Sequence, residues 1–482
     1  MTPLTLDKPT TIHLFDRLLG MEQMISRLSE IQLQSNSNIA QVKDALLQPL
    51  STAANFTAET VDFPFTPAQL TLTTSTQDFP SLKESDMLIQ FFLEGNEPFI
   101  RLSHVPFFNQ QLREHRSGQS PLYFETVLPC IDALAMAALS SDFVHDFFGR
   151  SRNELLPTLR KKAEAALIKA DFMRSQQPIV LRSLLYFITF LFEIGDNEYA
   201  SSLVGVAWRA AFRIGLHRDR TDTSPFVRDA RRRMWLHLQH LDNRAASLLG
   251  VESMMKTEWD TLAPKNASDE TWEDYRTARE SFDSEPPAVI GFTDTSFVLA
   301  RAQIEMLQQQ IRSASMTFEH METYIGERQQ DIWLRYVSDS GNKPLERFMV
   351  TLLEIQISAV YLTARQAHHK ESSDNFRAQS FITAIELLER ISAVEADMYY
   401  NQYSWALRAF VPIRAIVTVL TCMLFNSTPN CEARGWQQIG KIYARYDNVD
   451  CQLAKSSVFE PVNVLREQAL QAKRQREMQL QP

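Results

Sequence analysis

Apolar residues recur at helical spacing along most of the chain. From about residue 84 onward, segments with apolar side chains at i, i+3 and i+4 alternate with short polar breaks, and no long stretch alternates as a β-strand does. This pattern predicts helices over residues 159–172, 178–194, 198–214, 224–249, 296–312, 343–368, 375–394, 405–425 and 436–445. We therefore predict an all-α fold, with one large multi-helical domain over residues 84–482.

A narrower apolar seam lies in the first segment, residues 11–48. Its apolar residues are separated alternately by four and three positions, the spacing of a coiled coil: Leu14, Leu18, Met21, Ile25 and Leu28. Gln32 and Ser35 then interrupt the seam. We predict a short coiled-coil-like helix, which either pairs with another chain or packs on the body of its own chain.

The composition changes between this helix and the large domain. Residues 50–80 are dense in Thr and Ser, and three prolines break any helical period. Such a segment buries too little apolar surface to offset the entropy lost on ordering. We predict a flexible linker over residues 49–83, and a domain boundary there.

Composition and charge exclude several classes of protein. The chain has 58 acidic and 49 basic residues, a net charge of −9, whereas general attraction to nucleic acid needs an excess of basic residues. Four cysteines in 482 residues exclude a disulfide scaffold and fit a reducing compartment: Cys130, Cys422, Cys431 and Cys451. We find no secretory signal, and the apolar runs at 184–192 and 415–425 are shorter than the ~20 residues of a membrane span. We expect a soluble intracellular protein with no membrane partner.

The most tempting metal-binding cluster is His237, His240 and Asp242, because two imidazoles three residues apart share a helix face. Apolar residues interleave with them, however, as in an ordinary amphipathic helix. His145-Asp146 resembles a metal-binding pair of phosphohydrolases, but its further ligands cannot be placed. The cysteine spacing does not fit a structural zinc site, and common enzymatic motifs are absent. We predict no catalytic, cofactor-binding or metal site.

Four arginines form the densest basic cluster: Arg228, Arg231, Arg232 and Arg233. They would suit phosphate binding. Asp229 lies four residues before Arg233, however, and Asp219 and Asp222 lie just upstream, so ion pairs account for the cluster as well. We favour structural ion pairing, with some guanidinium groups bonded to carbonyls of the preceding turn.

One stretch is more specific than the rest. Residues 207–219 read AWRAAFRIGLHRD, and RRRMW follows at 231–235, LD at 241–242 and SLLG at 247–250. In this order the motifs resemble the fungal-specific transcription factor domain, the middle homology region of binuclear zinc cluster regulators. Residues 262–270 are similar to its Leu-Pro-x-Asn-x-x-Asp segment, with Ala263 inserted. The resemblance covers about residues 90–280.

These motifs have clear structural roles. Gly215 can end a helix in the left-handed conformation, after which Leu216 folds back onto the core. Trp208 and Trp235 can pack two successive helices together. We expect Asp219 and Asp242 to neutralise the cluster at residues 231–233.

The resemblance also reveals a departure. Members of the family usually begin with six cysteines that hold two zinc ions, whereas the first cysteine here is Cys130. We expect a nuclear transcriptional regulator of a metabolic or secondary-metabolite pathway that does not bind DNA through zinc. It would act through a DNA-binding partner or a homodimer formed by residues 11–48. A truncated N-terminus is the alternative.

Two further functions stay open at this point. The helical domain could have become a small-molecule-binding protein or a biosynthetic enzyme, in which case the nearest acid–base groups are His217, His237, His240 and Asp242. Alternatively, the chain could sequester full-length relatives through its seam. A small-molecule effector is implied by the resemblance.

Overall fold

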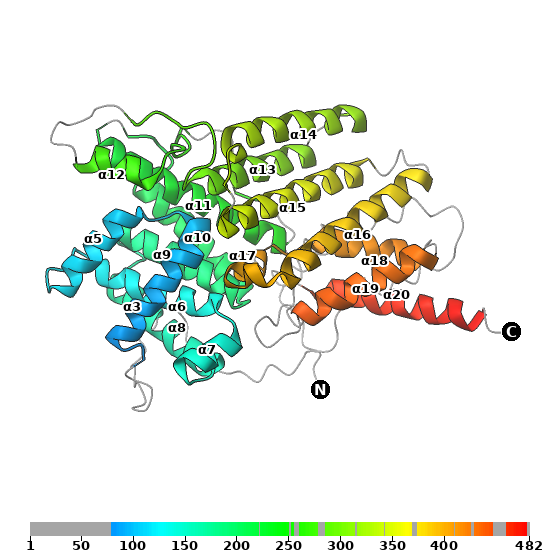
Figure 1. Cartoon of the computed structure of the whole chain (residues 1–482), viewed down its shortest axis with the longest axis horizontal. Coiled ribbons are helices and arrows are strands. Elements are labelled where there is room, and N and C mark those ends of the chain that lie inside the picture. The colour runs from blue at the N-terminus through cyan, green and yellow to red at the C-terminus, as the bar shows by residue number, and fades with distance from the viewer. Residues whose placement is uncertain are drawn as a thin grey trace, which may run out of the picture.

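The structure is a computed structural model that describes residues 79–479, except 221, 250–251, 255–259, 278–284, 314–315, 342, 369–373, 409, 426–428 and 447–458. Within these residues all repeating secondary structure is helical (Figure 1). The predicted all-α class is confirmed. The predicted coiled-coil-like helix at 11–48 and most of the predicted linker at 49–83 lie outside the described residues.

In the first half of the described chain, the other helices pack around two apolar helices. Its elements are α3 (Leu82–Phe91), a π-helical turn (Phe92–Asn96), α4 (Glu97–Ile100), α5 (Val105–Arg116), α6 (Phe124–Ala138), α7 (Ser141–Phe148), α8 (Arg152–Lys169), α9 (Pro178–Glu193), α10 (Asn197–Arg213), α11 (Pro225–Leu249) and α12 (Asp269–Thr277). Almost every residue of α6 and α9 is buried. Because these helices are apolar on all sides, they lie at the centre, against each other and against α8 and α10.

The second half continues the same core. Its elements are α13 (Ser296–Ser313), α14 (Phe318–Ile332), a π-helical turn (Trp333–Val337), α15 (Pro344–Ala367), α16 (Asp374–Ala396), a 3₁₀ turn (Met398–Tyr403), α17 (Ser404–Arg408), α18 (Ile413–Phe425), α19 (Pro429–Tyr446) and α20 (Glu460–Gln479). Helices α13, α14 and α15 lie side by side (Figure 1). One cluster of buried apolar side chains extends through both halves.

Helix α15 is long and apolar enough to cross a membrane, by length and composition. Neither of the two shorter apolar runs noted in the sequence analysis lies in this helix. However, 56% of its apolar window is buried inside the protein, against α13, α14 and α16. Such burial is typical of a core helix, and we assign α15 to the core.

Several boundaries differ from the prediction. The helix predicted at 159–172 is observed as Arg152–Lys169, and the one predicted at 436–445 as Pro429–Tyr446. The helix predicted at 405–425 is divided into α17 and α18, with Pro412 just before the second helix, because a proline disfavours helical backbone in the residue that precedes it. Helix α3 begins at Leu82, where Ser81 and Glu84 form a reciprocal capping box. Phe79 is also buried, with its ring 5.8 Å from that of Phe148. The end of the predicted linker therefore belongs to the folded body.

Candidate functional site

The corner between α10 and α11 is built as its sequence predicts. Gly215 has a φ of 71°, its N–H donates to the Phe212 carbonyl at 3.0 Å, and the N–H of Leu216 donates to the Ala211 carbonyl at 2.9 Å. These bonds satisfy the last carbonyls of α10. Leu216 is buried, so the predicted return onto the core is confirmed.

Two tryptophans join these helices. The rings of Trp208 on α10 and Trp235 on α11 lie 4.8 Å apart at 86°, an edge-to-face contact. Both side chains are buried. Their predicted packing role is confirmed.

The first two arginines of the cluster hold the corner in place. Arg231 donates to the carbonyls of Ile214 and Gly215, at 2.9 and 2.8 Å. Arg232 forms ion pairs with Asp219 and with Glu285, the latter at 2.8 Å. Both roles predicted for the arginine cluster, ion pairing and hydrogen bonding to carbonyl groups, are therefore confirmed.

Arg233 lies deeper and is almost completely buried. It pairs with Asp229, one turn earlier, at 2.8 Å and with Asp269 at 3.3 Å. Burial opposes the charge of this guanidinium, but the two carboxylates raise its pKa above the ordinary arginine value. A buried cation held by two carboxylates is fixed in position and is closed to a phosphate ligand.

Asp269, the first residue of α12, joins three segments. Besides Arg233, it pairs with Arg101 at 2.9 Å and accepts the backbone N–H of Val105 at 2.9 Å. Burial alone would raise the pKa of Asp269, but Arg101 and Arg233 hold it below its ordinary value. This carboxylate therefore ties α12 to α11 and to the turn before α5.

The segment before α12 is anchored through Asn266. Its amide donates to the carbonyls of Val289 and Gly291, at 2.8 and 2.9 Å, and its oxygen accepts the hydroxyl groups of Thr293 and Ser296. The family-like residues at 262–270 thus fix the path of the chain toward α13. We call Arg101, Asp229, Arg233, Asn266 and Asp269, with their bonds, the signature network.

The two candidate histidines on α11 lie beside each other, with ring centroids 5.8 Å apart. His237 Nε2 is 3.0 Å from the Thr189 hydroxyl, and His240 Nδ1 is 2.6 Å from Glu305. Burial, with the charges of nearby arginines, lowers the pKa of both histidines well below the ordinary value. Both imidazoles are therefore neutral at physiological pH.

Asp242 points elsewhere. Its Oδ2 accepts the Ser253 hydroxyl at 2.5 Å and the Met254 N–H at 2.7 Å. The prediction that Asp242 neutralises the arginine cluster is wrong, because that cluster is paired with Asp219, Asp229, Asp269 and Glu285. Its position also removes the third ligand that a metal site with the two histidines would use.

The partner of His240 comes from α13. Burial raises the pKa of Glu305 to about 7 and lowers that of Arg301 to about 10. Arg301 donates to the Phe99 carbonyl at 3.0 Å, and Arg244 pairs with Glu193 at 2.8 Å nearby in α9. These groups form a paired polar cluster inside the core. Sequence reasoning missed the α13 residues because they lie about 60 positions from the histidines.

The remaining candidates are scattered. His217 lies with its ring 5.0 Å from that of Phe212, while His145 and Asp146 are exposed on α7. Cys130 is buried in α6, where burial raises the pKa of its thiol. In the part of the chain that the structure describes, no three His, Cys, Asp or Glu side chains gather as a metal ion would require.

Comparison with known families decides the identity of this architecture. Residues 88–340, just over half of the chain, match the model of the fungal specific transcription factor domain. The chain belongs to this family. The signature network lies entirely within the matched residues, and the family consists of transcription factors rather than enzymes.

Curated relatives agree with the family. The chain is 25% identical over 390 residues to the aurofusarin cluster transcription factor of Gibberella zeae, an alignment that covers 76% of this chain and 57% of the relative. It is 31% identical to the pyriculol/pyriculariol biosynthesis cluster transcription factor 1 of Pyricularia oryzae, over 38% of this chain and 25% of the relative. It is 27% identical to the C6 finger domain transcription factor nscR of Aspergillus fumigatus, over 47% of this chain and 30% of the relative. The chain thus spans from a quarter to just over half of the length of these relatives.

Proposed function

We propose that this protein regulates transcription of genes for the biosynthesis of a secondary metabolite, and that it acts in the nucleus. The observation that carries the proposal is the family match over residues 88–340. Two of the relatives are named as regulators of biosynthetic clusters. The contacts of the signature network support a scaffold role, since its charged groups are buried and paired with one another.

The proposal includes the way the protein reaches DNA. The net charge of the 482 residues is −9, which does not favour general attraction to nucleic acid. We propose that DNA is contacted through a partner, either a DNA-binding transcription factor or a second copy of this chain. The apolar seam of residues 11–48 would join them.

A pair of substitutions tests this mode of action. Leu18→Asp with Ile25→Asp places charges in the seam, whereas Gln23→Asp with Ser26→Asp adds the same charge outside it. The seam variant should halve the mass measured by light scattering, or lose the partner on co-purification, and should lose chromatin occupancy by the tagged protein. The control should retain both. Unchanged mass, partner and occupancy in the seam variant would refute this role of residues 11–48.

A further inference from the structure

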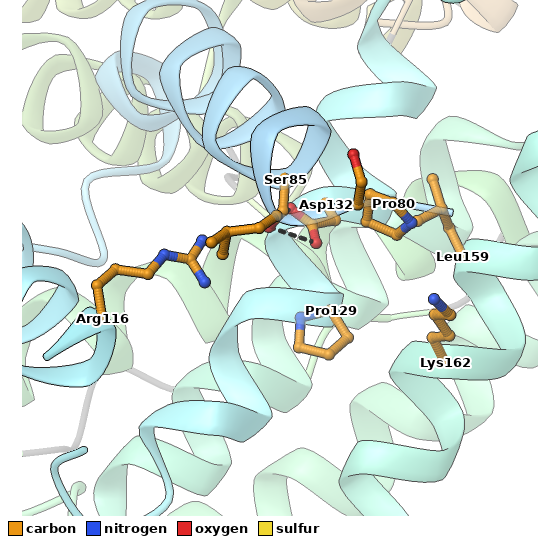
Figure 2. A pocket seen from close by; sticks show the side chains of 9 residues that line it. Pro80, Ser85, Arg116, Pro129, Asp132, Leu159 and Lys162 are labelled. Carbon is orange, nitrogen blue, oxygen red and sulfur yellow. Dashed lines mark hydrogen bonds between the residues drawn. The ribbon is translucent and has the colours of Figure 1, made fainter. Parts of the chain in front are cut away.

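A pocket of about 300 Å³ opens on the face of the molecule where α3, α5, α6 and α8 meet (Figure 2). None of the residues that line it belongs to the signature network. Its volume is at the lower end of the range for small-molecule sites. A ligand of one ring with a few substituents would fill it.

Apolar side chains form part of its wall. Leu159 of α8 is fully buried, and Pro129 lies inside α6. The ring of Pro80 lies between Asp132 and Leu159 in this view (Figure 2). These groups offer no hydrogen bonds, so they suit the apolar body of a ligand.

One acidic group is set into the wall. Asp132 of α6 is 4% exposed, and the Ser85 hydroxyl lies 3.1–3.2 Å from its two oxygens. Burial raises the pKa of Asp132 to about 7, against the opposing effects of Ser85, Arg116 and Lys162. Near neutral pH this carboxyl can therefore either accept or donate a hydrogen bond to a hydroxyl group.

Two cations line the same pocket. Arg116, at the end of α5, is one-quarter exposed and pairs with Asp86 at 2.6 Å. Lys162 of α8 is half-buried, and its charge acts on both Asp132 and Glu84. The long side chains of both bring positive charge to a site whose other walls are partly apolar. A carboxylate bound there would form charge-assisted hydrogen bonds.

We infer that this pocket binds a small organic acid with an apolar, ring-sized body and a hydroxyl group. The carboxylate of the ligand would lie against Lys162, its body against Pro129 and Leu159, and its hydroxyl group toward Asp132, while Arg116 adds positive charge from the other side of the pocket (Figure 2). The use of this binding to control transcription rests on the proposed function. The inference that the pocket binds such an acid does not depend on the proposed function.

The test uses the purified full chain and 4-hydroxybenzoate as the probe, measured by calorimetry or by ligand-detected NMR. We expect saturable binding, with 4-hydroxybenzamide and inorganic phosphate each bound at least about tenfold more weakly, because one lacks the charge and the other the apolar body. Lys162→Met should weaken binding of the probe at least about tenfold. Lys161→Met, at the exposed neighbouring position, should leave it unchanged.

Three results would overturn the inference: no saturable binding of the probe, phosphate bound as tightly as the probe, or equal losses in the two lysine variants. Circular dichroism checks that both variants fold, and Lys162→Gln gives the same comparison if the methionine variant does not. The experiment requires no transcription. Failure of the proposed function would therefore appear in the cell while binding persists, and failure of this inference would appear in the calorimeter alone.

Discussion

Arg233 and Asp269 lie 3.3 Å apart inside the protein, and each of them has a second ionic partner, Asp229 and Arg101 respectively. The resulting chain of alternating charges crosses from α11 to α12 and on to the turn before α5. Taking charges out of water is costly, so such a chain is stable only when every member is paired. The ion pairs of the family signature therefore fix the positions of α11, α12 and the turn before α5 relative to one another.

Removal of one member should therefore destabilise the fold strongly. Arg233→Met leaves two carboxylates buried near each other, and we expect the free energy of unfolding to fall by about 3–5 kcal/mol. Denaturation followed by circular dichroism measures this loss. Arg335→Met is the control, because Arg335 forms an exposed pair with Asp331 that contributes less than about 1 kcal/mol. Equal losses in the two variants would show that the buried network is not structural.

An alanine in the turn at Gly215 should destabilise the protein, whereas an alanine at the control position should stabilise it. At a φ of 71°, an alanine is strained although its Cβ would meet only Arg231 Nη2, at an acceptable 3.8 Å. Gly215→Ala should lower the melting temperature, at a cost of about 1–2 kcal/mol. Gly205→Ala, in the middle of α10 with open space around its Cβ, should stabilise by about 0.5–1 kcal/mol. A stabilised Gly215→Ala protein would contradict the conformation of this corner.

Glu305 makes stability depend on pH. Its pKa rises from 4.5 in the unfolded chain to about 7 in the folded protein, so between these values the folded state binds more protons. The free energy of unfolding contributed by this group therefore falls as pH rises from about 4.5 to about 7. Glu305→Gln removes the titration, and relative to the unmodified protein it should gain on the order of 1–3 kcal/mol between about pH 5 and about pH 8.

Denaturation at a series of pH values gives this difference directly. The control is Glu327→Gln, which removes the same charge from an exposed position on α14. The low pKa values of His237 and His240 give a slope of the opposite sign below about pH 6.5. If the Glu305→Gln curve runs parallel to that of the unmodified protein above that pH, the buried state of Glu305 is wrong.

Periodicity located the helices with a continuous apolar face. The helix predicted at 178–194 is observed as Pro178–Glu193, and the one predicted at 224–249 as Pro225–Leu249. It did not predict α12, because that helix is polar and buries only Asp269 and Trp272. A short polar helix is stabilised by specific tertiary contacts, and the pattern of hydrophobic residues along the sequence does not reveal those contacts.

The local part of the signature network was also predictable. Asp229 and Arg233 are one helical turn apart, so their pairing follows from helix geometry. Arg101 and Asp269 are 168 positions apart, and no residue pattern connects them. Asp242 was assigned to the arginines because it lies near them in sequence, but its position on α11 turns it toward Ser253 and Met254.

The central claim is that residues 207–250 belong to a gene-control scaffold without reactive groups. The most direct measurement is the abundance of the transcripts of secondary-metabolite biosynthetic genes after deletion of this gene, alongside the profile of small metabolites. We predict a change in these transcripts that is restored by the unmodified gene and also by a gene carrying His237→Gln and His240→Gln, provided that this protein folds. Unchanged transcripts with an accumulating pathway intermediate would contradict the account.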